Sequence, residues 1–473
     1  MINCFKEPTV MMLTGKEIIE KSKGRLLQGN PEKQVSGCAI DSRQASAGTL
    51  FVPFAGQHTD GHLYIAQAAE QGAVAAFSEP GKALELNLPP DFLLVEVEDT
   101  LTALQQLAAA YRKKFDLTVV GITGSSGKTT TKDFIAGVLA AKYKVLKTTG
   151  NLNNEIGLPL TILQLKEDHQ VAVLEMGMSA AGEIGTLCEI AAPSIGVITN
   201  IGEAHIELLG SVEAIARAKG ELLDYLGSGG VAVLNGDDPR LLDLGKRFPG
   251  KVYYYGFNQG DIKGLQLSQR GEKSFSRVRF PNNTEEWFES PLPGRESVSN
   301  ALAALTVAYI LKLSLPEMQK GLKASEFSAG RFQVLHNKDG ITIIDDTYNA
   351  NPSSVRAALR VLADLEKPYK AAVLGDMLEL GETAKEAHHS VGRFAAECGL
   401  DCLVTVGELA RHMAEAAAVA GVRVYPCPDH ECALRALQKL NLGNDWAVLV
   451  KGSRGMQMEV IVQSLSSAEG DDR

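Results

Sequence analysis

Residues 117–131 read LTVVGITGSSGKTTT, and this stretch decides the fold of the middle of the chain. Its first part, Leu117–Thr123, is apolar and rich in β-branched residues, which is typical of a parallel strand buried on both faces. Residues 129–142 then show the apolar spacing of a helix. A glycine-rich turn between a buried strand and a helix predicts a loop that wraps around phosphate groups.

The predicted phosphate loop departs from the strict nucleotide-binding pattern at one position, because the glycine expected at 122 is Ile122. Its glycine amides can still turn toward phosphate oxygens, its lysine can reach the β and γ phosphates, and a threonine can ligate magnesium. We therefore predict ATP binding by Gly124, Ser125, Ser126, Gly127, Lys128, Thr129 and Thr130. The alternative is a turn that only caps a helix. GTP is disfavoured because Asp339 comes one residue too early after Asn337 for a guanine-reading pattern.

Two side chains follow predicted strands of the same sheet. Glu175 ends the predicted strand Val171–Met176, and His205 follows the predicted strand Ile195–Asn200 and a short turn. The carboxyl ends of parallel strands face the crevice where ligands bind, so both are candidates for metal or substrate contact. The alternatives are a solvated acid and a structural histidine.

Lys219 stands out in the helix predicted from 211 to 226. The apolar face of this helix runs through Ile215 and Leu222, and Lys219 falls on the same face at spacings of three and four. A lysine there either extends to solvent or does chemistry. Burial would favour the neutral amine, which can react with carbon dioxide to give a carbamate able to bind magnesium.

Strand and helix patterns alternate along the chain, so we predict an α/β protein of three domains. The predicted bounds are 1–116 for a small N-terminal α/β domain, 117–328 for a central parallel-sheet domain and 329–473 for a C-terminal Rossmann-like domain. Residues 328–330 resemble a linker. Residues 251–289 alternate in polarity and predict an antiparallel extension of the central sheet.

Composition narrows the function classes. A net charge of -10 argues against a nucleic-acid partner, because phosphate backbones need a basic face. The N-terminus has no apolar run that suggests a signal peptide, and no stretch predicts a membrane span. The odd number of cysteines, 7, fits reduced thiols in a cytoplasmic enzyme better than a disulfide framework. We expect a monomer.

Taken together, the loop with its doubled threonine, the Glu175 strand end, the turn from 200 to 205 and the Lys219 segment resemble the Mur ligase family. The resemblance implies three domains and an ATP- and magnesium-dependent ligase. It implies that Lys128 and Thr129 serve ATP and its metal, that Glu175 and His205 complete the metal sites, and that Lys219 is carbamylated. It also places Asn300 near the adenine, with Arg331 and Asp346 reaching the nucleotide from the third domain.

Three further segments resemble the same family, and with them the resemblance implies that D-alanyl-D-alanine is added to UDP-N-acetylmuramoyl-tripeptide. They are GNLNNEIGLP at 150–159, DDTYNANP at 345–352 and KGSRGM at 451–456. The resemblance implies substrate contacts at Ser42 and Arg43 for the UDP group, Asn153 and Asn154 for the peptide, and Tyr348, Asn349 and Asn351 for the dipeptide. Ordinary polar turns are the alternative for these residues.

The implied mechanism has two steps. The tripeptide carboxylate attacks the γ phosphate to give an acyl phosphate, and the dipeptide amine then attacks the acyl carbon. We expect an open form without ligands and closure of the third domain with them, because water would hydrolyse the acyl phosphate. The rival hypotheses are a ligase with another amine, such as the third-residue ligase or a folate polyglutamate ligase, and a nucleotide switch without ligase activity.

Overall fold

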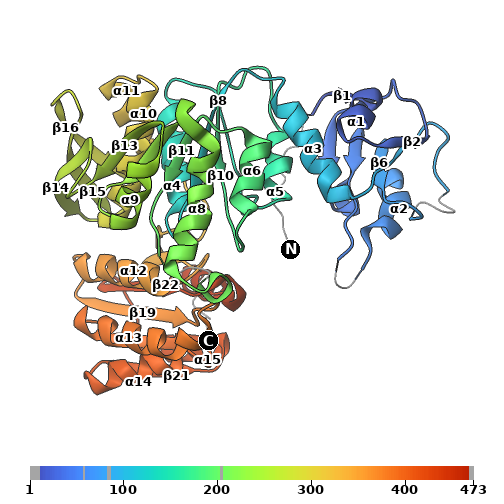
Figure 1. The fold of residues 1–473 in the computed structure, drawn as a ribbon. Helices are drawn as coiled ribbons and strands as arrows, with labels where there is room; N and C mark the ends of the chain where they lie inside the picture. The colour runs from blue at the N-terminus through green and yellow to red at the C-terminus, as the bar shows by residue number, and fades with distance from the viewer. Residues whose placement is uncertain (1–10, 57–58, 83–86, 203–205, 468–473) are drawn as a thin grey trace.

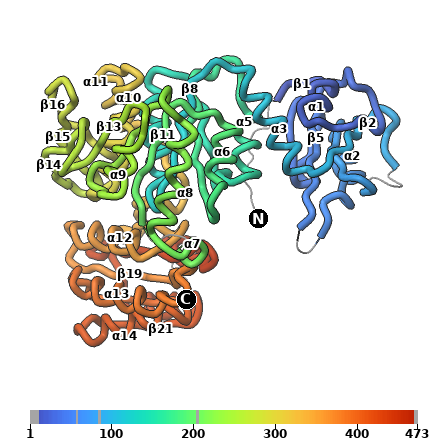
Figure 2. Tube along the Cα trace, viewed as in Figure 1, coloured from blue at the N-terminus to red at the C-terminus, as the bar shows by residue number. Residues whose placement is uncertain are grey.

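The computed structural model describes residues 11–56, 59–82, 87–202 and 206–467 (Figure 1). Three α/β bodies follow one another along the chain, which confirms the predicted fold class. The N-terminal body, in blue, lies to one side of the central body, and the C-terminal body, in orange and red, lies below it. The Cα trace in Figure 2 shows the same arrangement, with the N-terminal and C-terminal bodies attached to different parts of the central one.

The N-terminal body is a small twisted sheet with helices against it. Within the ranges just given, the larger sheet of this body has five strands in the order β2-β7-β6-β5-β4, and only β2 runs antiparallel to its neighbour. Strands β1 and β3 pair antiparallel in a separate two-stranded sheet. The elements are β1 (Leu13–Thr14), α1 (Gly15–Lys21), β2 (Arg25–Gln28), β3 (Gln34–Val35), β4 (Gly37–Ala39), β5 (Thr49–Phe51), α2 (Ile65–Glu70), β6 (Ala75–Ser78), β7 (Leu93–Glu96) and α3 (Thr100–Arg112).

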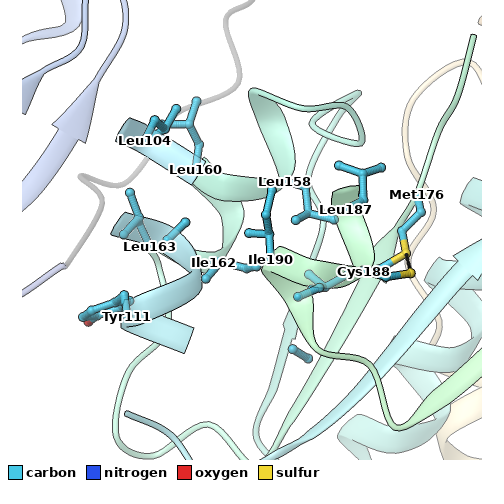
Figure 3. Close-up of a cluster of buried hydrophobic side chains, with 14 of the residues drawn as sticks. Leu104, Tyr111, Leu158, Leu160, Ile162, Leu163, Met176, Leu187, Cys188 and Ile190 are labelled. Carbon is cyan, nitrogen blue, oxygen red and sulfur yellow. Dashed lines mark hydrogen bonds between the residues drawn. The ribbon is translucent and has the colours of Figure 1, made fainter. Parts of the chain in front are cut away.

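Helix α3 joins the N-terminal body to the central one. Figure 3 shows Leu104 and Tyr111 of α3 lying beside Leu160 and Leu163, which belong to the central body. The Tyr111 hydroxyl donates to the carbonyl of Leu165 at 3.0 Å. This shared apolar core continues through Met176, Leu187, Cys188 and Ile190, so the two bodies have no separate interiors at this joint.

The central body is built on one large sheet. In the described part of the chain the strand order is β16-β15-β14-β13-β12-β11-β8-β10-β9, parallel from β9 to β14 and antiparallel only over β14-β15-β16. Its elements are β8 (Thr118–Thr123), α4 (Lys128–Ala140), β9 (Val145–Lys147), α5 (Gly157–Ile162), β10 (Val171–Glu175), α6 (Glu183–Ala191), β11 (Ile195–Ile198), α7 (Ile206–Leu209), α8 (Val212–Leu226), β12 (Val231–Asn235), α9 (Pro239–Arg247), β13 (Lys251–Gly256), β14 (Ile262–Arg270), β15 (Lys273–Arg279), β16 (Glu285–Ser290), α10 (Arg295–Ile310) and α11 (Leu315–Lys323).

The predicted antiparallel extension from 251 to 289 is wrong in its first part. Strand β13 is parallel to β12, and β14 begins parallel to β13. Helix α9 carries the chain back along the sheet between β12 and β13, and such a crossover joins parallel strands. The antiparallel pairing starts only at the tight turn between β14 and β15.

The C-terminal body is a sheet with helices on both faces. Among the residues described after 330, the order is β17-β18-β22-β19-β20-β21, with β17 antiparallel and the rest parallel. The elements are β17 (Gln333–His336), β18 (Thr342–Asp346), α12 (Pro352–Asp364), β19 (Tyr369–Gly375), α13 (Ala384–Glu397), β20 (Cys402–Val406), α14 (Arg411–Val419), β21 (Arg423–Cys427), α15 (His430–Gln438), β22 (Trp446–Lys451) and α16 (Glu459–Ser466).

The sequence did not predict the two edge strands of this sheet. Both β17 and β21 are partly exposed, and β21 contains Pro426, a residue that sheets accept mainly at edges. None of the helices in the described ranges combines the length and apolarity that crossing a membrane requires.

Candidate active site at the junction of the central and C-terminal domains

The predicted phosphate loop connects β8 to α4, and its glycines are required by the backbone. Gly124 and Gly127 have φ values of 149° and 75°, a region that side chains rarely adopt. A Cβ on Gly124 would also lie 1.9 Å from the Thr199 hydroxyl. The end of β11 holds the loop, since the Ser126 N–H donates to Asn200 Oδ1 at 2.9 Å and the Thr199 hydroxyl donates to the Ser126 carbonyl at 2.6 Å.

Lys128 lies inside this loop. Its Nζ donates to the Gly124 carbonyl at 2.7 Å. Burial lowers the pKa of Lys128, and the nearby Glu175 carboxylate opposes that shift. An ammonium at the cavity wall with a single backbone acceptor has donor capacity left for a phosphate oxygen.

Glu175 gathers side chains from three segments. Its Oε2 accepts from the Thr129 hydroxyl at 2.9 Å, and its Oε1 accepts from the Asn153 amide at 2.8 Å. The sequence had proposed all three residues, for metal or substrate, and the structure brings them into direct contact. His205, the fourth predicted residue of this group, lies outside the described residues.

The residues around Glu175 fit a magnesium site that substrate phosphates complete, and not a metal site made by protein side chains alone. The described residues contain no cluster of three His, Cys, Asp or Glu side chains that could hold a metal alone. Magnesium is usually held by one or two oxygen side chains together with substrate phosphates, and the Thr129 hydroxyl and Glu175 carboxylate supply such oxygens beside the phosphate loop.

Lys219 is buried on the inner face of α8, at 1% exposure, as its spacing predicted. Burial, and after it the charge of Lys128, holds the pKa of Lys219 well below its usual range. No carboxylate pairs with it among the residues that the structure describes. Burial therefore shifts Lys219 toward its neutral amine form, compared with an exposed lysine.

The C-terminal body contributes a second group of charges. The Asp346 carboxylate lies 2.5 Å from Lys451 Nζ, which also donates to the Asn349 carbonyl at 2.8 Å. The guanidinium of Arg331 lies 3.7 Å from the centre of the Tyr348 ring. The Arg331 Nε is buried and finds no acceptor in the described part of the chain, which leaves a donor available to an anionic ligand.

Sequence reasoning missed Lys451 as a site residue, although it begins the quoted KGSRGM segment. The available signal was a lysine at the carboxyl end of a buried strand, the position that had identified Glu175. Burial lowers the pKa of Lys451, and Asp346 opposes the shift.

These two groups line one cavity of about 630 Å³ between the central and C-terminal bodies. The predicted residues on its wall are Ser125, Ser126, Gly127, Lys128, Thr129, Thr130, Asn153, Asn154, Glu175, Asn300, Arg331, Asp346, Tyr348, Asn349 and Asn351. Gly124 and Lys219 are not among the residues that line the cavity. Asn300 packs against the phosphate loop, since a Cβ on Gly127 would lie 2.8 Å from its Oδ1.

Ser42 and Arg43 lie in the N-terminal body and do not line this cavity. The Ser42 hydroxyl donates to Gln67 Oε1 at 2.8 Å, and Arg43 pairs with Asp41 at 2.6 Å. The charge of Arg43 holds the pKa of Asp41 below its usual value. Any ligand that touches both Arg43 and Glu175 must therefore be long.

Two predicted substrate residues also have local structural roles. Asn351 caps α12, because its Oδ1 accepts from the Ser354 N–H at 2.9 Å. Asn154 Oδ1 accepts from the Gly157 N–H at 2.9 Å where α5 begins. These bonds use part of the hydrogen-bonding capacity of the two side-chain amides. The rest of that capacity is available to a substrate.

Comparison with known families gives matches along most of the chain. The description "Mur ligase middle domain" matches residues 122–308, "Mur ligase, glutamate ligase domain" matches residues 330–454, and "Mur ligase family, catalytic domain" matches residues 34–112.

Individual proteins match over nearly their full length. The UDP-N-acetylmuramoyl-tripeptide--D-alanyl-D-alanine ligase of Bacillus subtilis strain 168 is 39% identical over 456 residues, which are 96% of this chain and 98% of that protein. A crystal structure of MurF from Acinetobacter baumannii has a TM-score of 0.88 at 31% identity, covering 97% of this chain and 99% of that chain. MurF ligase from Thermotoga maritima in complex with ADP has a TM-score of 0.79 at 29% identity, covering 91% of this chain and 96% of that chain.

Proposed function

The chain belongs to the Mur ligase family, and from this premise we propose how its cavity joins D-alanyl-D-alanine to the terminal carboxylate of UDP-N-acetylmuramoyl-tripeptide. The protein is an ATP- and magnesium-dependent ligase of peptidoglycan precursor synthesis. The observation that carries the mechanism is the single cavity with the phosphate loop on one wall and Asp346, Tyr348 and Lys451 on the other.

In the first step, the phosphate loop and Lys128 hold the γ phosphate in line with the tripeptide carboxylate. A carboxylate oxygen bonds to the γ phosphorus while the bond from that phosphorus to the ADP oxygen breaks. This chemistry depends mainly on positioning and charge neutralisation. Thr129 and Glu175 would hold a magnesium ion here, which would neutralise the phosphate charge when bound.

In the second step, the dipeptide amine attacks the acyl carbon, phosphate leaves and the nitrogen loses a proton. We assign Tyr348 and Asn349 to the dipeptide because they line, from the C-terminal domain, the same cavity as the phosphate loop. Asn351 lines it as well. Asn153, bonded to Glu175, is placed to orient the tripeptide end. Asn154 lies beside it on the wall. We assign Asn300, Arg331 and Asp346 to the nucleotide.

We assign the UDP group to Ser42 and Arg43 in the N-terminal domain. Their separation from the cavity agrees with a substrate whose nucleotide end and reacting carboxylate are far apart. Binding energy gained at the remote UDP end can then orient the carboxylate.

We assign a carbamate to Lys219, formed when its neutral amine adds to carbon dioxide and loses a proton. Its burial and lack of a carboxylate partner in the described residues support this, and the carbamate would add an anion to the magnesium site that includes His205. Carbon-13 NMR of protein equilibrated with labelled bicarbonate tests it. A carbamate signal that Lys219→Ala retains would exclude this lysine.

We further propose that the enzyme works as a monomer in the cytoplasm. The lining residues of the cavity within the described part of the chain all come from one copy, which supports the first statement. Size-exclusion chromatography with light scattering tests it, and a stable dimer would contradict it.

The decisive experiment measures ADP release with UDP-linked tripeptide, with and without D-alanyl-D-alanine. We expect release that depends on the dipeptide, and a Lys128→Ala variant without activity. A panel of other amines separates the rival ligases. Nucleotide binding without any dipeptide-stimulated release would reject the ligase function in favour of a switch.

A further inference from the structure

The segment that enters the C-terminal domain is fastened to the helix that begins at the phosphate loop. Ser328 donates twice to Asp133 Oδ2 on α4, from its backbone N–H and from its hydroxyl, both at 3.0 Å. Just before it, Phe327 packs edge-to-face on Phe134 with ring centres 4.8 Å apart. The segment therefore follows the surface of α4 instead of spanning freely between domains.

Asp133 is built into the central domain by charge as well as by burial. Its side chain is fully buried, and its Oδ1 lies 2.8 Å from Lys147 Nζ and 3.4 Å from Lys132 Nζ. Lys147 also donates to the Glu326 carbonyl in the same segment, at 3.3 Å. Two cations hold one carboxylate oxygen, so the other is oriented toward Ser328.

Two residues after Ser328, the chain is bonded to the C-terminal domain instead of to α4. Gly330 has a φ of 68°, and its carbonyl accepts from the Tyr348 N–H at 3.0 Å. Arg331 then stacks on the Tyr348 ring. Ala329 is exposed and separates Ser328, which is bonded to α4, from Gly330, which is bonded to the C-terminal domain. The backbone at Ala329 is thus the short piece between two fixed ends.

We propose that Asp133 is a positioning residue for the reaction: by holding Ser328 against α4, it sets where Arg331 lies relative to Lys128. Asp133 is five residues after Lys128 on the same helix, about one and a half turns. Arg331 is three residues after Ser328. The path from Lys128 through Asp133 and Ser328 to Arg331 therefore contains one flexible joint. This inference rests on the assignment of Arg331 to the nucleotide.

The test compares Ser328→Ala with a control on the same segment, Ser325→Ala. The Ser325 hydroxyl donates to the Gly321 carbonyl and not to α4, so its loss leaves the Asp133 attachment intact. We expect Ser328→Ala to lower kcat about fivefold, the effect of one hydrogen bond. KM for the UDP-linked tripeptide should not change, because Ser42 and Arg43 lie on another domain. Ser325→Ala should match the wild type.

A double-mutant cycle with Arg331→Ala separates positioning from general destabilisation. If Ser328 acts through Arg331, its loss should cost little once Arg331 is removed. An equal fivefold loss in both backgrounds, or wild-type kcat in Ser328→Ala, would overturn the proposal. Asp133→Asn should have a larger effect, since it leaves Lys132 and Lys147 without their counter-charge. If that variant fails to fold, the Ser328 cycle still decides.

A measurement independent of turnover completes the test. Amide hydrogen exchange at residues 326–331 should speed up in Ser328→Ala and stay unchanged in Ser325→Ala. Unchanged exchange in Ser328→Ala would contradict the proposal. An inactive wild-type enzyme would reject the ligase function instead, and the exchange result would still report on the attachment.

Discussion

Buried lysines mark the functional region at the scale of single residues. Lys132, Lys219 and Lys451 are buried and Lys128 is half-buried at the cavity wall, and burial lowers the pKa of all four. Buried lysines are rare unless paired or functional. These lysines differ in whether a carboxylate balances their charge. Lys451 pairs with Asp346 and Lys132 with Asp133, whereas the charged group that shifts the pKa of Lys219 is Lys128.

Replacing Lys451 with methionine should damage both stability and activity. The Asp346 charge would lose its buried partner, which costs about 3 to 5 kcal/mol of unfolding free energy, and would face the nucleotide phosphates uncompensated. We expect kcat/KM about a hundredfold lower. Thermal unfolding and ADP release measure the two effects. Arg454→Met is the matched control, because its pair with Glu459 is exposed and is worth under about 1 kcal/mol.

At the scale of elements, α3 is the part of the N-terminal domain that fixes it to the central sheet. Its last residue, Arg112, is buried and donates to three carbonyls, those of Ala191, Phe115 and Leu117, at 3.1, 2.8 and 3.2 Å. Arg112 thereby connects the end of α3, the strand that leads to the phosphate loop, and the end of α6.

Arg112→Met should lower the free energy of unfolding by about 3 kcal/mol, because the buried carbonyls would lose their donors. Denaturant unfolding of the purified protein measures it. Lys113→Met, at the exposed neighbouring position, should change stability by less than about 0.5 kcal/mol. Equal stability of the two variants would show that Arg112 contributes nothing beyond a surface cation.

The turn after β19 depends on a neutral histidine from α13. His388 is fully buried, its Nδ1–H donates to the Ala384 carbonyl at 2.7 Å, and its Nε2 accepts from the Met377 N–H at 2.9 Å. Burial lowers the pKa of His388 below its ordinary 6.5, with His412 acting in the same direction and the Ala384 carbonyl and Asp376 opposing. The adjacent Asp376 accepts from the Ala410 N–H and supports the Ser453 loop.

The pH dependence follows from the direction of this shift. A group whose pKa is lower in the folded state binds fewer protons there than in the unfolded state. Its contribution to the free energy of unfolding is therefore full above about pH 6.5 and is lost as pH falls through the folded-state pKa. We expect the wild type to lose more stability than His388→Leu between about pH 7.5 and pH 5.5, by at most about 1.4 kcal/mol, the limit for one histidine over this range. Unfolding curves at both pH values measure it. His389→Gln should keep the wild-type dependence, and a pH-independent wild type would contradict the assignment.

At the scale of the molecule, the central domain carries the two others on separate sites. Figure 1 shows the C-terminal domain below the central sheet and the N-terminal domain beside it. The C-terminal attachment has contacts that motion can break, such as the pair of Arg360 with Glu296 at 3.7 Å and that of His336 with Glu272 at 2.7 Å. The shared core around α3 offers no such freedom.

We therefore expect closure to involve the C-terminal domain alone. Small-angle scattering should show a smaller radius of gyration when a non-hydrolysable ATP analogue and the UDP-linked tripeptide are added together. Arg331→Ala should compact less, because the contact between the third domain and the nucleotide is removed. Identical scattering with and without ligands would exclude ligand-induced closure.

The sequence predicted the elements that carry the phosphate loop, Glu175 and Lys219 to within a few residues. It predicted them because buried parallel strands and amphipathic helices have strong local patterns. It misread β13 and missed β17 and β21, whose residues are partly exposed and have weak patterns. Pairing direction also depends on the path of the connection between two strands and not on the strands themselves.

Contiguous residues determined by themselves the strand, the glycine turn and the helix of the phosphate loop, and the helical period alone placed Lys219 on a buried face. Only the tertiary structure brought Lys451 to Asp346 across 105 positions, and Ser328 to Asp133 across 195. The reason is that backbone geometry and periodicity act between neighbours in the chain. Charge pairing and hydrogen bonding act through space, over distances that only the packed domains define.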